Sequence, residues 1–132
     1  MLNLPLPVRL HDGCAVVVLP EEIDAVNADM VTDTLLTVLN RTGTSVIADM
    51  TGTTFCDAAG VRAIIRAHIR ARSLDTGLRV VLTSPIVRRI FQLTRVDELV
   101  RVYPALGLAL PKPRRPARGT GGELARLAVL RR

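Results

Sequence analysis

Three short, mostly apolar segments recur along the chain, at residues 14–19, 45–49 and 78–82, and the first of them is apolar throughout. Runs of this length between turn residues are typical of strands buried on both faces of a sheet. Residues 27–39, and a second segment that starts at Asp57, carry apolar side chains at every third or fourth position, as amphipathic helices do. This alternation predicts an α/β domain in which helical crossovers join parallel strands.

Turn residues indicate where these elements begin and end. Asp12-Gly13 lies between two apolar runs and predicts an opening β-hairpin. Gly43 closes the first helix, Ser84-Pro85 begins a third one, and a last short strand is expected at residues 99–103. We therefore expect a small mixed, mostly parallel sheet of about four or five strands, packed against about four helices. The expected buried stripe of the third helix is Ile86, Val87, Ile90, Phe91 and Leu93.

The distribution of charge divides the chain into two parts. Its 132 residues are 48% apolar, which is enough for one domain that needs neither disulfides nor metals to fold. Residues 1–110 carry 11 basic and 11 acidic side chains, whereas residues 111–132 carry 7 basic side chains and one acidic one. We expect a folded domain over residues 4–110, followed by a basic, flexible tail over residues 111–132.

Side chains that could carry catalysis are few. The two histidines and two cysteines lack the spacing of a zinc site, and the chain has no phosphate-binding glycine motif and no nucleophile elbow. Asp24, Asp49 and Asp57 follow predicted strands, where α/β sheets place their sites, but capping and turn formation explain them better. The sequence therefore predicts no enzyme, no bound metal and no cofactor.

Composition also bears on the class of partner. Two Phe and one Tyr are too few for a base-stacking surface, and the row formed by Arg62, Arg66, Arg70 and Arg72 has the spacing of any solvated helix face. No apolar run approaches the roughly 18 residues that cross a bilayer, and residues 1–7 lack the pattern of a signal peptide. We expect a cytoplasmic protein, a monomer or weak dimer, with no specific nucleic-acid or membrane partner.

One block of sequence resembles a known family. Residues 48–61 read Ala-Asp-Met-Thr-Gly-Thr-Thr-Phe-Cys-Asp-Ala-Ala-Gly-Val. The block is similar to the strand–loop–helix signature of STAS domains, and more narrowly to the Phe-x-Asp-Ser-Ser/Ala-Gly pattern of bacterial anti-sigma factor antagonists. Glu22-Ile23-Asp24 resembles the family's Glu-Leu-Asp, and residues 84–91 resemble its Ser-Pro-x-Val-x-x-Leu/Phe-Phe helix. The matching blocks extend from about Val8 to Tyr103 in the same order.

The resemblance implies a STAS fold and a function in partner switching. In that family a kinase-like ATPase acts both as anti-sigma factor and as serine kinase, and it phosphorylates the residue after the aspartate. The unphosphorylated antagonist captures this ATPase and frees the sigma factor. The implied contact residues are Asp24, Thr53, Thr54, Asp57, Ala58, Ala59 and Gly60.

Position 58 departs from the family pattern, because it holds Ala where the phosphorylated serine is expected. Natural divergence and an engineered, non-phosphorylatable form both fit this residue, and Thr53 or Thr54 are the candidates for a relocated phosphosite. The resemblance thus implies an antagonist that is not phosphorylated at the usual position.

The alternative function is a STAS domain that binds a ligand or serves as a scaffold in a stress-signalling assembly. The threonine-rich loop and the helix start at Asp57 could hold an anion on free backbone N–H groups. Arg62 is the basic side chain nearest to that helix start, but it lies a full turn further along.

The charge distribution leads to a first prediction, that the basic tail is separable from the domain. A chain that ends at Leu110 should keep the cooperative thermal transition of the full chain. Calorimetry checks this, and a fall in the melting temperature of more than roughly 10 °C would show that the tail packs on the core.

Overall fold

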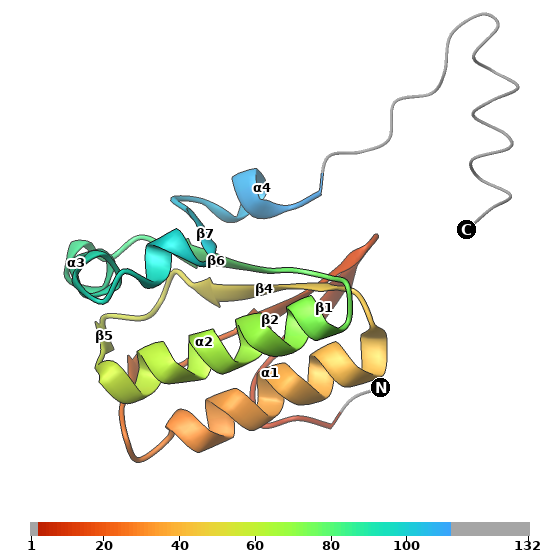
Figure 1. Ribbon diagram of the computed structural model, residues 1–132, viewed down its shortest axis with the longest axis horizontal. Coiled ribbons are helices and arrows are strands. Elements are labelled where there is room, and N and C mark those ends of the chain that lie inside the picture. The colour runs from red at the N-terminus through yellow and green to blue at the C-terminus, as the bar shows by residue number, and fades with distance from the viewer. Residues whose placement is uncertain (1–2, 112–132) are drawn as a thin grey trace, which may run out of the picture.

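A computed structural model describes residues 3–111 and shows a twisted sheet with helices on both of its faces (Figure 1). The main sheet has five strands in the order β1-β2-β4-β6-β7, and a separate two-stranded sheet pairs β3 with β5. The strands are β1 (Val8–His11), β2 (Cys14–Val18), β3 (Glu22–Ile23), β4 (Ser45–Met50), β5 (Phe55–Cys56), β6 (Leu78–Leu82) and β7 (Arg101–Tyr103). The helices are α1 (Ala28–Thr42), α2 (Ala58–Ser73), α3 (Pro85–Leu93) and α4 (Leu106–Ala109), with a 3₁₀ turn, η1, at Val96–Glu98.

The connections of the main sheet follow from the turn chemistry of the sequence. β1 and β2 are antiparallel and meet at Asp12-Gly13, where Gly13 has the positive φ of +79° that this tight turn requires. β2, β4, β6 and β7 are all parallel, with α1, α2 and α3 as crossovers between them. The expected mixed, mostly parallel sheet with an opening hairpin and four helices is therefore confirmed.

The core lies mainly between the sheet and two long helices. α1 and α2 run side by side across one face of the sheet (Figure 1), and their inward side chains Val31, Leu35 and Ile64 are fully buried. α4 covers part of the opposite face, where a smaller cluster forms around Val16, Ile47 and Val81. Strands covered on both faces are mostly apolar, which explains the apolar runs in the sequence, and the Arg79 side chain on β6 donates to the carbonyl of Ala109.

Two helix ends form as their sequence signals predict. Gly43 adopts the left-handed conformation, with φ +62°, and its N–H donates to the carbonyl of Leu39 at 2.9 Å, which closes α1. The Ser84 hydroxyl accepts a hydrogen bond from the N–H of Val87 at 3.3 Å, and Pro85 occupies the first turn of α3.

The prediction of a single buried stripe on α3 is wrong. Val87 and Phe91 are buried, but Ile86 is 67% and Leu93 is 64% exposed. Positions 87 and 91 lie one turn apart on the face that contacts the domain, and a nine-residue helix has only one such face, so apolar residues outside it remain in solvent. On α2, Ile69 is likewise 62% exposed, although its spacing suggested burial.

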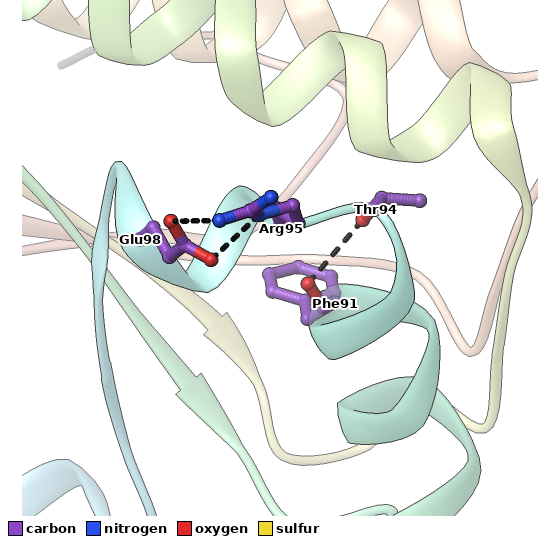
Figure 2. A network of polar contacts seen from close by, with 4 residues as sticks. All are labelled: Phe91, Thr94, Arg95 and Glu98. Carbon is purple, nitrogen blue, oxygen red and sulfur yellow. Dashed lines mark hydrogen bonds and ion pairs between the residues drawn. The ribbon is translucent and has the colours of Figure 1, made fainter.

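The chain reverses direction after α3 through a compact turn (Figure 2). The Thr94 hydroxyl donates to the carbonyl of Phe91 at 3.4 Å, and Arg95, at φ +62°, pairs with Glu98 at 2.8 Å. Because residues 96–98 form η1, the last strand begins at Arg101 and not at residue 99 as expected.

The first turn of α2 packs directly against β3 and β5. A Cβ added at Gly60 would lie 2.5 Å from the Cys56 Sγ and 2.9 Å from the Ile23 Cγ2. Both side chains are buried and have little room to move. Gly60 is therefore required for the close approach of the helix to the small sheet.

A Gly60→Ala substitution should lower the free energy of unfolding by about 1–3 kcal/mol, because overpacking at this contact exceeds the roughly 1 kcal/mol that alanine gains in a helix. Urea denaturation measures the effect. Gly52→Ala is the matched control, since a Cβ there meets nothing within 4 Å. Equal stability of the two variants would contradict the packing described for Gly60.

Candidate functional site

The site at the start of α2 is built on the pairing of β3 with β5. These parallel strands align Glu22 with Phe55 and Ile23 with Cys56. The N–H of Asp57 continues the ladder by donating to the carbonyl of Ile23 at 3.1 Å. The segment before α2 is thus held to the segment before α1, although about 30 residues separate them in the sequence.

The loop between β4 and β5 is fixed by hydrogen bonds at both of its ends. The N–H of Thr51 donates to the carboxylate of Asp49 at 3.0 Å, and the Thr53 hydroxyl donates to the carbonyl of Pro20 at 2.8 Å. The N–H of Thr54 donates to the carbonyl of Glu21 at 2.8 Å. These contacts attach the threonine-rich loop to residues 20–21 and fix the position at which β5 begins.

Asp57 caps α2 and presents the next residue to solvent. Its carboxylate accepts hydrogen bonds from the N–H groups of Ala59, at 2.9 Å, and Gly60, at 3.3 Å. Ala58 follows as the first residue of the helix, and its side chain is exposed. A side chain at position 58 therefore stands at a helix N-terminus, beside a carboxylate that already occupies the cap.

Cys56 is the buried neighbour of this cap. Burial, together with the nearby Asp57 carboxylate, raises the pKa of its thiol to about 12. The thiol is 2% exposed and remains protonated at neutral pH, so Cys56 serves as a small packing residue beneath α2.

Asp24 lies in the turn that follows β3, close to the α2 start. Its carboxylate accepts a hydrogen bond from the N–H of Val26 at 2.9 Å, and its N–H donates to the amide oxygen of Asn27 at 3.0 Å. The Asn27 side chain also donates to the carbonyl of Glu22 at 2.7 Å. Asn27 thereby stabilises the whole turn. We did not assign this role from the sequence, although its position directly before α1 is one signal for it.

The structure brings the seven expected contact residues to one end of the sheet, with different exposures. Thr54 and Ala58 are exposed, and Asp24, Asp57 and Ala59 are partly exposed. Thr53 is fully buried and Gly60 is buried, so both support the surface from within. Thr53 has no free hydroxyl at the surface, because its hydroxyl donates a hydrogen bond to the carbonyl of Pro20.

Two apolar side chains beside this end were not expected to be exposed. Val26 is 93% exposed in the turn before α1, and Phe55 is 46% exposed on β5. Sequence reasoning missed both, because Val26 lies in a turn and Phe55 on a two-residue strand, and neither segment is long enough to show an alternating pattern. Val26 lies two residues after Asp24, and Phe55 lies three residues before Ala58.

The three aspartates each accept hydrogen bonds from backbone N–H groups of a turn or a helix start. The Asp24 and Asp49 carboxylates each accept a hydrogen bond from a backbone N–H two residues later, and the Asp57 carboxylate caps α2. The preferred interpretation of turn and cap formation is confirmed. Among residues 3–111 there is no group of three or more His, Cys, Asp or Glu that could hold a metal ion, and no helix there is long and apolar enough to span a membrane.

A shallow groove of about 250 Å³ lies between α1 and α2 next to this surface. Its polar side chains are Asp29, Thr32, Arg62 and Arg66, and the Thr32 hydroxyl already donates to the carbonyl of Ala28 at 2.9 Å. The groove is smaller than the cavities of roughly 300–1,000 Å³ that usually bind small molecules. Arg62 and Arg66 share the groove with the Asp29 carboxylate, which offsets part of their positive charge.

Comparison with known proteins agrees with this geometry. Residues 6–109 match the STAS domain family. The fold is similar to an anti-sigma factor antagonist from Mycobacterium paratuberculosis, with 28% identity, a TM-score of 0.73 and coverage of 79% of this chain and 88% of that one. No curated protein sequence gives a match.

Two further solved structures share the fold at lower identity. An anti-sigma-factor antagonist (STAS) domain protein from Planctomyces limnophilus is 17% identical, with a TM-score of 0.70 and coverage of 79% of this chain and 92% of that one. The anti-sigma factor antagonist SpoIIAA in its unphosphorylated form is 16% identical, with a TM-score of 0.67 and coverage of 79% and 91%. With the family match over residues 6–109, these similarities establish that the chain belongs to the STAS domain family.

Proposed function

We propose that this chain is an anti-sigma factor antagonist that binds an anti-sigma factor of the kinase-like ATPase type and so releases a sigma factor in the cytoplasm. The observation that carries the proposal is the exposed start of α2, where Asp57 caps the helix and the uncharged side chain of Ala58 faces solvent. The similarity to a mycobacterial anti-sigma factor antagonist at 28% identity supports it. Binding and release of this kind require no catalysis by the chain itself.

Position 58 is where a phosphate would act in such a complex. A phosphate adds about −1.5 to −2 charges, here beside the Asp57 carboxylate that caps the helix. A partner surface shaped for a small neutral side chain would reject that charge, because burying it without a counter-ion is costly. With Ala58 in place, the chain is a permanently competent antagonist at this position.

A buried charge at position 58 should weaken the complex. Ala58→Glu should keep the fold, since acidic side chains are favoured in a first helical turn, and should weaken partner binding at least tenfold, or about 1.4 kcal/mol. Calorimetric titration with the partner ATPase measures it. Ala105→Glu, a second exposed alanine at a helix start, on α4, is the matched control and should bind as the parent does. Equal affinity of Ala58→Glu and the control would place position 58 outside the interface.

A hydroxyl at position 58 should restore a phosphorylation site. The Ala58→Ser variant, incubated with the partner ATPase and ATP, should gain one phosphate, visible by intact mass, while the parent chain gains none. If the parent chain is phosphorylated instead at Thr54, whose side chain is exposed, the phosphosite has moved and the chain is not a permanent antagonist.

The partner itself is the remaining element of the proposal. Capture of the chain from its native host, followed by mass spectrometry, should recover a kinase-like ATPase. Recovery of other STAS proteins in a large assembly, with no such ATPase, would contradict the proposal and favour the scaffold function.

A further inference from the structure

The neutral domain carries its charges in two separate regions. Residues 1–40 hold six acidic side chains and one basic one, whereas residues 41–110 hold ten basic and five acidic ones. Five of the acidic side chains fall between positions 21 and 33, a stretch without Lys or Arg. In the described part of the chain the one ion pair joins Arg95 to Glu98, so none of these five carboxylates has an ion-pair partner there. They are Glu21, Glu22, Asp24, Asp29 and Asp33.

Apolar side chains lie among these carboxylates. Val26 is the most exposed large apolar residue of the described chain, at 93%, and Phe55 lies opposite Glu22 in the β3–β5 register. We call the surface formed by residues 21–22, residues 24–26, Asp29, Phe55 and Ala58 the acidic face. An exposed apolar centre with a negative rim fits a segment in which basic and apolar side chains alternate.

The chain carries such a segment of its own. Residues 112–132 hold seven basic side chains against one acidic one, and residues 124–130 add three leucines and a valine. We propose that residues 112–132 bind the acidic face of the same molecule and thereby compete with the partner for the surface around Ala58. The competition rests on the function proposed above, whereas the contact of the tail with the acidic face does not.

The length of the segment allows this contact. The chain leaves α4 on the face of the sheet opposite α1 and α2 (Figure 1), and α4 packs on strands of only five or six residues. Such a strand is about 20 Å long. A segment of 21 residues can span at most about 70 Å. The carboxyl end of the sheet is therefore within reach.

Electrostatics directs the segment to one face. Arg62 and Arg66 line the groove beside Asp29, so the attraction for a basic segment is strongest at Glu21, Glu22 and Asp24. Tethering supplies an effective concentration in the millimolar range, which populates even a weak contact. We expect the contact to be strong at low salt and to disappear near 0.5 M salt, where the screening length falls to about 4 Å.

Paramagnetic broadening in the full chain tests the contact. A nitroxide is attached at Thr120→Cys, and it reacts there selectively because Cys14 and Cys56 are buried and burial raises the pKa of both thiols. At low salt the amide signals of residues 21–29 and 54–59 should broaden at least twofold more than those of residues 62–74. Glu21→Gln combined with Glu22→Gln should remove at least half of this difference. High salt should remove it entirely.

The control variant removes two carboxylates elsewhere. Asp75→Asn combined with Asp97→Asn makes the same change in net charge, and Asn tolerates the positive φ of +56° at position 75. This variant should leave the broadening unchanged. Broadening that is uniform, or that ignores salt and the Glu21 and Glu22 changes, would overturn the proposal. A mixture of isotope-labelled molecules without the nitroxide and spin-labelled molecules without the isotope is the second control. Equal broadening in this mixture would also overturn the proposal, since the tail would then bind a second copy.

A separate measurement tests the competition. Arg114→Gln, Arg115→Gln and Arg118→Gln together should tighten binding to the partner ATPase about two- to tenfold, because a competing intramolecular state is removed. If the triple variant binds the ATPase with the affinity of the parent chain, and the parent chain still shows the broadening, the competition is refuted and the contact of the tail stands. Absence of any ATPase binding by the parent chain would refute the proposed function and leave the contact of the tail standing.

Discussion

The pairing of β3 with β5 is the constraint on which the surface at position 58 depends. Two residues from each strand align, and the ladder continues through the N–H of Asp57 to the carbonyl of Ile23. This pairing sets the point at which α2 can begin, and the Asp57 cap then fixes its first turn. Gly60 lets that turn lie against Cys56 and Ile23. The strand pairing, the Asp57 cap and the contact at Gly60 together hold position 58 at the surface.

The same arrangement explains why a small neutral residue suits this position. Ala is the best helix former and leaves no hydrogen-bonding group without a partner, so the first turn loses nothing without a hydroxyl. The cap already contains one carboxylate, and a second negative charge beside it would be costly to bury in a close complex. A docking surface built on Ala58 is therefore simple to form and has no charge switch of its own. Control of such a surface would have to come from elsewhere in the chain or from the partner.

Local signals in the sequence were sufficient for the main sheet and its helices. Asp12-Gly13, Gly43 and Ser84-Pro85 each act within a few residues, and the elements they delimit appear in the structure. The exposed side of α3 could not be predicted, because Ile86 and Val87 have similar hydrophobicity and only the tertiary packing decides which one is buried. Thr53 is a similar case, since its burial depends on a bond to Pro20, 33 residues earlier. Two-residue strands such as β3 and β5 are too short to show any periodicity, so the strand pairing that supports the site could not be predicted from the sequence.

The central claim is that the partner docks on the end of the sheet where β3, β5 and the start of α2 meet. Hydrogen–deuterium exchange of the full chain, alone and with the captured ATPase, tests it most directly. The account predicts slower exchange of the amides of residues 20–26 and 54–60 in the complex, with α4 and the β1–β2 hairpin unchanged. Protection confined to α4 or to the hairpin, with residues 54–60 exchanging as in the free chain, would contradict it.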